Sequence, residues 1–530
     1  MAAAEDPIAA ASSGLPAARW AASTGITPLL VSFLAGLVSA FGFQPVGWWP
    51  LTLLAFALLL GLVVGAPHAR SALARGWWFG LGHFALGLNW IATAFTYQAA
   101  MPAWLGWIAV LLLSLYLAIF PAVAAGLAWQ WGAGKGGHHV RFVLLFAAAW
   151  IVTEWLRAAL FTGFAWNPAG VVLLPTSLSR LAILIGTYGL SGILMLLAGA
   201  LLLAAQGRRR PAAAIGLPPI LLGLLLAASA SAPPVTAVAL RIVQPNIGEA
   251  EKWNPDEAAG HLARLVAMSR APGRQPQLLL WPEAAITSPI ENGLADPTYR
   301  QDAEQLRRRL GAVAGSGLLL TGGVTWRSAD GIHVTSATNS VFALDGTGRI
   351  LVRYDKAHLV PYGEYLPMRP ILSRIGLSRL APGDTDFDAG PGPRSVDLPL
   401  AGRVGFQICY EIIFSGEVVD RANRPDFLFN PSNDAWFGRW GPPQHLAQAR
   451  LRALEEGLPV VRATPDGISA LVDAEGRIVQ SLPWRTAGII DGHLPGPRPP
   501  TPFARFGNLL PLLFALLLAA TAIAVGRRRR

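Results

Sequence analysis

The sequence predicts a polytopic α-helical membrane domain of about eight helices joined to a water-soluble α/β domain. Apolar residues make up 53% of the 530 residues and charged residues only 14%, against about 45–50% and about 25% in an ordinary soluble domain. Long apolar runs fill the chain before residue 232, and one more run closes it. From about 235 to 500, strand-like runs alternate with charged, helix-like stretches. This segregation favours two kinds of domain in one chain.

We therefore divide the chain into an N-terminal membrane domain with seven helices (1–232), a soluble domain (235–500) and a C-terminal transmembrane helix with a basic tail (503–530). An apolar helix needs about 17–25 residues to cross the hydrocarbon of a bilayer. We expect such helices near 26–43, 50–65, 76–95, 103–128, 142–160, 186–205, 213–231 and 506–526.

The first apolar run has a second interpretation, as the apolar part of a signal peptide. The triplet Val38-Ser39-Ala40 loosely resembles a cleavage site. However, about 25 residues with a single basic residue precede the run, which is unlike the short charged start of a signal peptide. We expect the run to be retained as a membrane helix.

Basic residues predict the orientation of the membrane helices. With eight helices, nearly all the basic residues outside the soluble domain fall on one side: Arg19, Arg70, Arg75, Lys135, Arg141, Arg208 to Arg210 and Arg527 to Arg530. Arg180 is the exception on the other side. Because cytoplasmic loops carry an excess of Lys and Arg, both termini should lie in the cytoplasm. The soluble domain then faces outward.

The net charge of +11 arises largely in these loops and in the tail, so it favours anionic lipid as a partner over nucleic acid. The sequence has no Gly-rich phosphate loop between a strand and a helix, and no basic stretch interleaved with aromatic residues. The histidines lack the spacing of a zinc site. We therefore expect membrane lipid as a partner, and no nucleic acid, metal or cofactor.

The soluble domain alternates strands and helices, which predicts a layered α/β sandwich. We expect strands from 237, up to Glu283, at 317–321, on both sides of the turn 345–348, at 404–408 and at 427–429. Helices are expected at about 255–270, 297–314, 409–423 and 443–457, followed by a hairpin over 469–482.

Cys409 is the only cysteine, so it cannot form an intramolecular disulfide, and its position raises the question of reactivity. A buried, inert cysteine is the simplest alternative. Two other strand-like runs also end in chargeable side chains, at Glu283 and at Lys356. A thiol, a carboxylate and an ammonium at strand ends together make a nucleophile, its base and a cation for developing negative charge.

Three motifs then resemble the Glu, Lys and Cys signatures of the carbon–nitrogen hydrolase (nitrilase) superfamily: Trp281-Pro282-Glu283, Tyr354-Asp355-Lys356 and Cys409-Tyr410-Glu411. The resemblance implies an α-β-β-α sandwich. The strings at 359–367 and 432–438, with membrane helices on both sides, resemble the apolipoprotein N-acyltransferase family in particular. That resemblance covers essentially the whole chain.

The resemblance implies a role for each motif residue. Cys409 is the expected nucleophile and Glu283 its base, while Lys356 and the backbone N–H of Tyr410 hold the oxyanion. The resemblance also implies three supporting residues. Glu364 is expected to orient the lysine or the incoming amine, Glu411 to contact the catalytic residues, and Trp253 to lie near the acyl site. Glu364 as a surface charge and Glu411 as a helix-start carboxylate are the alternatives.

The resemblance also implies a two-step acyl transfer. Cys409 would take an acyl chain from a phospholipid, usually phosphatidylethanolamine, and pass it to the N-terminal diacylglyceryl-cysteine of an apolipoprotein. The place would be the periplasmic face of a bacterial inner membrane. The segment 368–380, with three arginines among apolar residues, would be a mobile arm at that interface or an ordinary surface loop. A membrane-tethered amidase, and a non-catalytic transporter or sensor, are the alternative functions.

Overall fold

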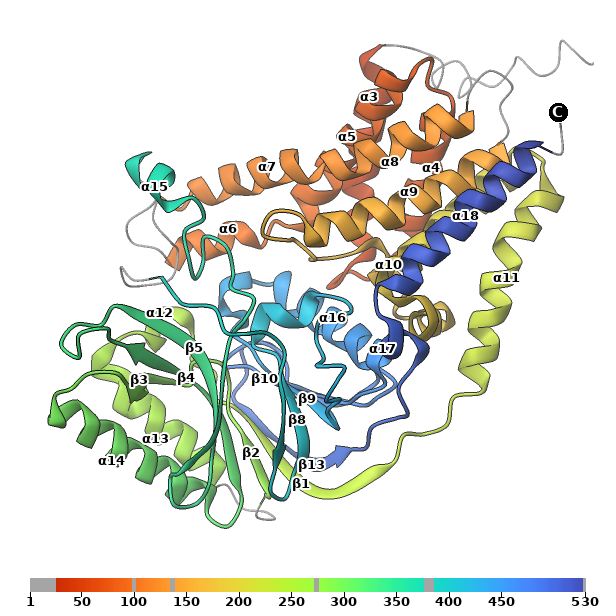
Figure 1. The fold of residues 1–530 in the computed structure, drawn as a ribbon. Helices are drawn as coiled ribbons and strands as arrows, with labels where there is room; N and C mark the ends of the chain where they lie inside the picture. Colours follow the sequence, from red (N-terminus) through yellow and green to blue (C-terminus); the bar gives the residue numbers. More distant parts are fainter. Residues whose placement is uncertain (1–24, 98–101, 134–138, 271–275, 376–385, 528–530) are drawn as a thin grey trace, which may run out of the picture.

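The computed structural model describes residues 25–97, 102–133, 139–270, 276–375 and 386–527. The chain folds into a cluster of long helices and a domain of two sheets that lies against one end of that cluster (Figure 1). The C-terminal helix returns to the cluster, so the first and last parts of the chain enclose the α/β domain in sequence.

Helices lie at all eight places where the sequence predicts membrane segments. Their bounds are α3 Ile26–Ser39, α4 Trp49–Val64, α5 Ala69–Gly87, α6 Ile91–Ala94, α7 Leu105–Leu117, α8 Ile119–Ala128, α9 His139–Ala159, α10 Ala182–Ala205, α11 Arg209–Ala228 and α18 Leu509–Arg527. Of the described residues, five helical stretches are long and apolar enough to cross a membrane, and two shorter apolar helices precede them.

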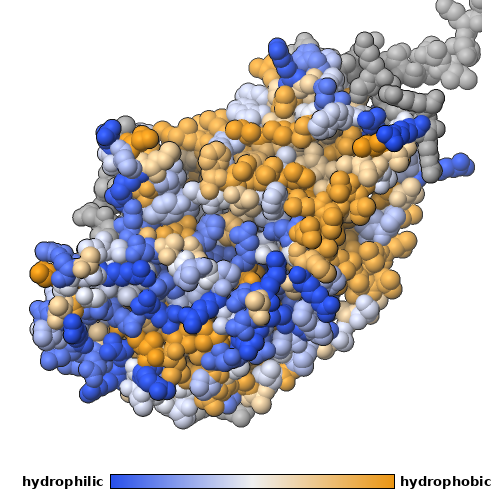
Figure 2. Space-filling model, in the orientation of Figure 1, coloured by the Kyte–Doolittle hydropathy of each residue, from blue (hydrophilic) through white to orange (hydrophobic). Residues whose placement is uncertain are grey.

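On the face seen in Figure 2, apolar side chains gather over the helix cluster and most of the hydrophilic surface lies over the α/β domain. Leu112 on α7, Leu225 on α11 and Leu517 on α18 are each 60% or more exposed. In water such a surface would be unfavourable by about 25 cal/mol per Å², so it fits a lipid environment. Arg75, which the sequence analysis counts among the loop charges, lies inside α5 and is fully buried.

The α/β domain contains two sheets. The first has the order β13-β1-β2-β4-β5-β6, with β3 paired to β4. Its strands are β1 Val235–Gln244, β2 Leu278–Leu280, β3 Ile286–Asn292, β4 Leu318–Arg327, β5 Ser336–Leu344, β6 Ile350–Asp355 and β13 Gly488–Pro495. The second has the order β12-β11-β10-β9-β8-β7. Its strands are β7 Ser395–Leu398, β8 Gly402–Phe406, β9 Phe427–Pro431, β10 Val460–Ala463, β11 Ala470–Val472 and β12 Ile478–Ser481.

The short strand β2 shows how the layers are built. Leu278 and Leu280 pack in the large core cluster that also contains residues of the second sheet, such as Phe406. Leu279 points to the opposite face and packs in a separate cluster with Leu310 of α14. Because successive side chains of a strand alternate between faces, three leucines in a row serve two cores at once.

Helices cover the outer face of each sheet. The helices α13 (Ala258–Ser269) and α14 (Pro297–Ala314) cover the first sheet, and α16 (Gly441–Glu456) lies between the second sheet and the membrane helices (Figure 1). This confirms the predicted α-β-β-α sandwich. The helix expected over 409–423 is wrong, because only the 3₁₀ turn η8 (Cys409–Ile413) forms there. Of the segment 368–380, α15 (Arg369–Leu372) and η7 (Ser373–Ile375) are described, and the remainder lies outside the described residues.

A buried polar junction fixes α16 to the membrane helix α10. The Oε1 atom of Glu455 accepts hydrogen bonds from the backbone N–H of Thr187 at 2.6 Å and from the Thr187 hydroxyl at 2.7 Å. Arg452 forms an ion pair with the same carboxylate at 2.6 Å. All three side chains are at most 1% exposed. A buried ion pair needs such additional hydrogen bonds to offset its desolvation, so the junction favours one relative placement of the two domains.

Candidate active site

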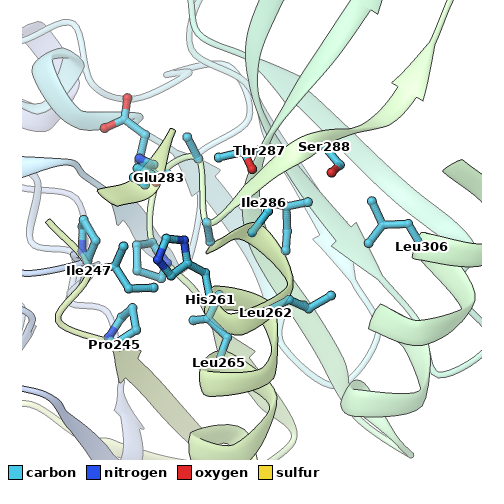
Figure 3. A pocket seen from close by; sticks show the side chains of 16 residues that line it. Pro245, Ile247, His261, Leu262, Leu265, Glu283, Ile286, Thr287, Ser288 and Leu306 are labelled. Carbon is cyan, nitrogen blue, oxygen red and sulfur yellow. The ribbon is translucent and has the colours of Figure 1, made fainter. Parts of the chain in front are cut away.

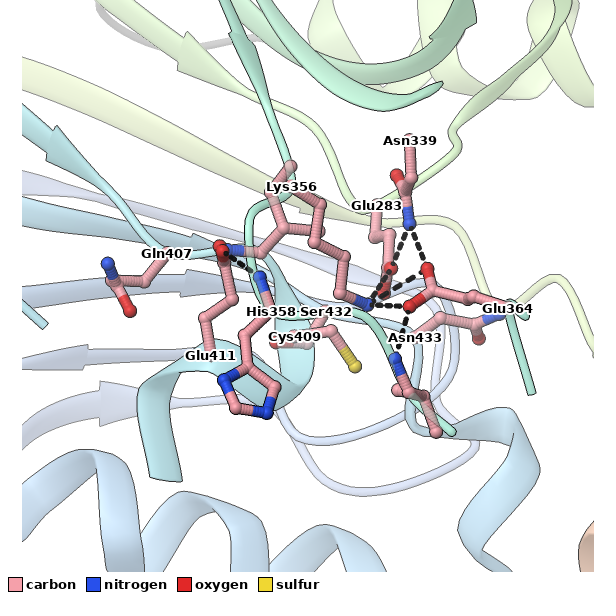
Figure 4. A network of polar contacts seen from close by, with 12 residues as sticks. Glu283, Asn339, Lys356, His358, Glu364, Gln407, Cys409, Glu411, Ser432 and Asn433 are labelled. Carbon is pink, nitrogen blue, oxygen red and sulfur yellow. Dashed lines mark hydrogen bonds and ion pairs between the residues drawn. The ribbon is translucent and has the colours of Figure 1, made fainter. Parts of the chain in front are cut away.

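The three motif residues follow the ends of strands in two different sheets. Glu283 follows β2, Lys356 directly follows β6, and Cys409 comes three residues after β8. Gly322 on β4 makes the first placement possible, since a Cβ there would lie 2.6 Å from the Cα atom of Glu283. The structure therefore brings a carboxylate, an ammonium and a thiol together where the two sheets meet (Figure 4).

Two carboxylates surround the Lys356 ammonium, which is 1% exposed. The Nζ atom of Lys356 lies 2.9 Å from Oε2 of Glu364 and 3.5 Å from Oε1 of Glu283. Burial lowers the pKa of Lys356, but Glu364 and Glu283 raise it by more, so the net pKa lies above the ordinary value. The lysine therefore stays a cation and can stabilise negative charge.

The two glutamates differ in what their oxygens do. Both oxygens of Glu364 are occupied, Oε1 by Asn339 at 2.9 Å and Lys356 at 3.0 Å, and Oε2 by the Val360 N–H at 2.8 Å. Glu283 receives Asn339 Nδ2 at 2.7 Å on Oε1. Its Oε2 atom is buried without a hydrogen-bond partner among the described residues. Glu283 thus keeps one oxygen available for a proton, whereas Glu364 is suited to hold the lysine.

Cys409 adopts a backbone conformation that is unusual for a residue with a side chain. Its φ angle is +51°, in the left-handed region that costs a non-glycine residue roughly 1–3 kcal/mol. The thiol is directed toward the cluster of Lys356 and the two glutamates (Figure 4), and it accepts a hydrogen bond from the backbone N–H of Asn433. Burial raises the pKa of the thiol well above its usual range, Glu283 adds to this, and Lys356 opposes it.

Glu411 joins the loop that carries Lys356 to the turn that carries Cys409. Its Oε1 atom accepts from the backbone N–H of Ala357 at 2.7 Å, the N–H of His358 at 3.1 Å and the hydroxyl of Tyr354 at 2.9 Å. Its Oε2 atom accepts from the Ile408 N–H at 2.6 Å. Burial raises the pKa of Glu411 to about 7 despite these donors. The carboxylate therefore sets the distance between the lysine and the cysteine.

We expect Glu411→Gln to lower both stability and activity. The amide nitrogen of glutamine would face at least one of the four donors, and a buried donor left without an acceptor costs about 1–3 kcal/mol. Thermal unfolding in detergent measures the first effect and the rate of thiol acylation the second. Glu417→Gln is the matched control, because Glu417 is an exposed neighbour whose carboxyl is outside this set of contacts. A Glu411→Gln protein with parental stability and rate would contradict the bridging role.

Trp253 borders the same site through a chain of contacts. Its indole N–H donates to Oε1 of Glu249 at 2.5 Å, and the other oxygen of Glu249 accepts from Asn433 Nδ2 at 2.6 Å. Asn433 is the residue whose N–H binds the Cys409 thiol. The adjacent Lys252 donates to the backbone carbonyl of Glu283 at 3.1 Å. Trp253 is therefore linked to the sulfur through three successive hydrogen bonds, on the side of α12 (Glu249–Lys252).

Tyr410 and its neighbours face the membrane helices. The Tyr410 hydroxyl lies 3.4 Å from the carbonyl oxygen of Gly163, and the His358 ring nitrogen Nε2 lies 3.1 Å from that of Thr162. Both acceptors belong to the loop that follows α9. Phe414 stacks on His358 with ring centroids 3.8 Å apart. The turn that carries the thiol thus contacts the membrane domain directly.

A small cavity of about 50 Å³ lies on the other side of the Glu283 backbone. The Glu283 carboxyl points away from it, and mainly apolar side chains such as Ile247, Leu262 and Leu265 line it (Figure 3). Its volume is too small for an acyl chain. Nearby, Glu251, Glu257 and His261 are the one set of metal-ligand types within reach of each other in the described part of the chain. Two of these three are exposed, and such groups are common without an ion.

Sequence reasoning missed several residues of this site. Asn339 lies in the middle of β5, within the polar run Thr338-Asn339-Ser340, so its position in the sequence carries no signal. Asn433 stands in a string that was noted only for its resemblance. His445, which contacts the Cys409 backbone at 3.1 Å, is one of the histidines that lack the spacing of a zinc site, and the sequence gives it no other signal. A polar residue at a fully buried position is the signal that would find such residues, and burial requires the structure.

Two family models match the chain in succession. The apolipoprotein N-acyltransferase N-terminal domain matches residues 35–200, and the carbon–nitrogen hydrolase domain matches residues 239–496. Curated relatives span nearly the whole chain. The apolipoprotein N-acyltransferase of Bradyrhizobium diazoefficiens is 37% identical over 94% of this chain and 95% of its own length. That of Rhodopseudomonas palustris is 35% identical over the same shares, and that of Caulobacter vibrioides is 36% identical over 92% of each. With its Glu, Lys and Cys at three strand ends, the chain belongs to the apolipoprotein N-acyltransferase family.

Proposed function

We propose that this membrane enzyme transfers an acyl chain from a phospholipid to the α-amine of the N-terminal diacylglyceryl-cysteine of apolipoproteins. The chain passes through a thioester on Cys409. The observation that carries the proposal is the full-length family relationship, combined with a buried thiol beside a free carboxylate oxygen and a lysine. Phosphatidylethanolamine is the donor we expect, as a major bacterial lipid with an ester-linked chain.

The first step forms the thioester. The thiol is protonated at rest because burial raises its pKa, so the free Oε2 atom of Glu283 takes the proton as the sulfur attacks the ester carbonyl. Negative charge develops on the carbonyl oxygen, and Lys356 and the Tyr410 N–H stabilise it. The tetrahedral intermediate then breaks its C–O bond. The leaving oxygen takes the proton from Glu283, and a lysophospholipid departs.

The second step transfers the acyl chain to the amine. The neutral α-amine attacks the thioester carbonyl, and Glu283 accepts the proton that the nitrogen loses. The C–S bond breaks, and the sulfur takes up that proton to restore the thiol. Glu364, held by Asn339 and the Val360 N–H, keeps Lys356 in place through both steps. Water must be kept out, because hydrolysis of the thioester would waste the acyl chain.

Contacts between the two domains support a lipid substrate over a small soluble amide. The Tyr410 and Phe414 rings lie against His358 and the loop after α9, next to the thiol. A membrane-tethered amidase would have no need for its nucleophile to contact the membrane helices. The apolar surface of those helices (Figure 2) would let acyl chains approach laterally from the bilayer.

An acyl-transfer assay tests the proposal. Purified enzyme in detergent is given phosphatidylethanolamine with an isotope-labelled acyl chain and a synthetic lipopeptide that begins with diacylglyceryl-cysteine. We expect labelled amide on the peptide and lysophospholipid in equal amounts. The same lipopeptide with an acetylated N-terminus is the control and should remain unlabelled. Release of free fatty acid at the same rate with and without the acceptor would favour a hydrolase instead.

We also propose that eight helices cross the membrane, with both termini in the cytoplasm and the α/β domain in the periplasm. The positive-inside rule supports this orientation, because Arg208 to Arg210 and the C-terminal arginines share one side. Arg75 does not count among the loop charges that support this orientation, since it is buried inside α5. The acceptor amine is available only after export, which requires the same orientation.

Cysteine labelling tests the orientation. In a Cys409→Ala background, Ala329→Cys on the exposed surface of the α/β domain and Gln206→Cys at the exposed end of α10 introduce single thiols. We expect a membrane-impermeant maleimide to label Ala329→Cys in cells whose outer membrane alone is permeabilised, and to label Gln206→Cys only after lysis. The opposite pattern would place the α/β domain in the cytoplasm, away from its acceptor.

A further inference from the structure

His445 on α16 contacts the backbone of the nucleophile. Its Nε2 atom lies 3.1 Å from the carbonyl oxygen of Cys409, and the imidazole is fully buried. A carbonyl oxygen only accepts hydrogen bonds, so Nε2 must carry the proton and donate it. Neither step of the proposed acyl transfer uses this contact.

The other ring nitrogen packs against an ion pair. Nδ1 of His445 lies 3.0 Å from Oδ1 of Asp434 and 3.0 Å from Nη2 of Arg462, so both members of the pair hold the ring. Burial and the Arg462 guanidinium lower the pKa of His445 below its ordinary value, with Asp434 opposing. The Nε2–H is thus directed at the Cys409 carbonyl, while Asp434 and Arg462 hold the ring at Nδ1.

Arg462 is itself held rigidly. Its Nη2 atom donates to both oxygens of Asp434, at 2.6 and 2.8 Å, and its Nη1 atom donates to Asn430 at 2.5 Å and to Ser432 at 2.8 Å. Every one of these side chains is fully buried. Networks of this kind leave little freedom to their members when they are satisfied. The direction of the His445 N–H is thus held by side chains from β9, β10 and the turn that begins at Asp434.

The peptide that receives this hydrogen bond joins Cys409 to Tyr410, and its N–H is the proposed oxyanion donor. A trans peptide is planar, with its C=O and N–H pointing in opposite directions. Fixing the carbonyl on the His445 side therefore fixes the direction of the Tyr410 N–H. A hydrogen bond to the carbonyl also polarises the peptide and makes its N–H a stronger donor. Because the φ angle of Cys409 is +51°, this peptide has to be held against a more relaxed conformation.

We propose that His445, oriented by Arg462 and Asp434, is a positioning residue that holds the Cys409–Tyr410 peptide with its N–H aimed at the developing oxyanion. The inference rests on the proposed acyl transfer and adds a residue to it. His445 touches neither substrate nor sulfur in this account. It acts through the peptide.

Two reactions of the same thiol separate this role from a general structural one. Acylation by phosphatidylethanolamine passes through a tetrahedral oxyanion, whereas alkylation by iodoacetamide is a direct displacement at carbon that forms none. Both need the thiolate and an intact site. A variant that only loosens the fold or impairs thiol activation alters both rates together, while loss of the oxyanion donor lowers acylation alone.

His445→Gln and His445→Met form a matched pair, since the side chains have similar length and shape but only glutamine offers an N–H donor. We expect His445→Met to acylate about 10- to 100-fold more slowly than His445→Gln, less than the 10²–10³ for outright removal of an oxyanion donor. Their alkylation rates should be equal. His445→Phe, which keeps a ring against Trp166 and Phe437, gives a second donor-free variant should methionine fail to fold.

Equal acylation rates for the Gln and Met variants would overturn the proposal, and so would a parallel fall in acylation and alkylation. The unmodified enzyme in the same assay keeps this test distinct from that of the proposed function. If the unmodified enzyme forms no acyl-enzyme, the acyl-transfer proposal fails. If it does, the comparison of variants decides on His445 alone.

Discussion

Cys409→Ser abolishes acyl transfer while the protein remains folded and inserted. A serine hydroxyl is far less acidic than a thiol, and the Glu283 carboxylate is too weak a base to ionise it. Loss of a nucleophile of this kind costs on the order of 10⁴-fold or more. The side chain is 4% exposed and differs by one atom, so the fold should tolerate the change. The acyl-transfer assay and thermal unfolding measure the two effects.

Cys409→Ala serves as the control, because it removes the nucleophile. Alanine, like cysteine and serine, carries a Cβ atom and has to adopt the same positive φ angle. Both variants should lack turnover and acyl-enzyme alike. Since the chain contains a single cysteine, no second thiol can substitute. Measurable acylation of the lipopeptide by either variant would remove Cys409 from the mechanism.

Glu283→Gln lowers the rate of the first step by on the order of 10²–10⁴, the usual contribution of a general base. The Oε2 atom of Glu283 has no hydrogen-bond partner among the residues that the structure describes, and an amide in its place cannot take the thiol proton. Because burial holds the Cys409 thiol protonated at neutral pH, the defect should appear in the formation of the acyl-enzyme and also in alkylation by iodoacetamide.

Glu291→Gln is the control for this change. Glu291 on β3 pairs with Arg353 at 2.8 Å and is partly exposed, so the same chemical change there should leave acylation intact. A Glu283→Gln enzyme that forms its acyl-enzyme at the parental rate would show that another group takes the thiol proton.

The position of the three motif residues could be predicted because each follows an apolar strand in sequence. Leu278 to Leu280 and Val404 to Phe406 form central strands with parallel neighbours, β4 and β9. These strands belong to two different sheets, and Lys356 follows β6, which is antiparallel to β5. The sequence therefore places each residue at a strand end, and the packing of the two sheets brings the three together. The contacts of Glu411 with both loops were not accessible in this way, because three of its four donors lie 53 to 57 residues away in the sequence.

The helix expected over 409–423 failed for a local reason. The run Ile412-Ile413-Phe414 is apolar enough to suggest a helix face, but all three residues are buried and only the short turn η8 forms there. Gly416 then adopts a φ angle of +80°, which ends any helix. Cys409, with its positive φ, likewise contacts His445, which is 36 residues away in the sequence. Residue propensities do not encode such tertiary contacts.

The membrane segments were predictable as apolar runs, but their number as spans was not. The third predicted segment corresponds to α5, which carries Arg70, Arg75 and His83. Arg75 lowers the mean hydropathy of α5, but because its side chain is buried inside the protein, it does not mean that the helix lies in water. Composition alone therefore separates five clear spans from the shorter or more polar helices beside them.

Intact-mass analysis of the enzyme tests the central claim most directly. The purified protein is incubated with phosphatidylethanolamine of a single acyl composition and no acceptor, then digested to locate the modification. We predict one added acyl chain per molecule, carried by Cys409 as a thioester that hydroxylamine removes, and its disappearance when the diacylated lipopeptide is added. An enzyme that modifies the lipopeptide while Cys409 stays free throughout would contradict the thioester mechanism.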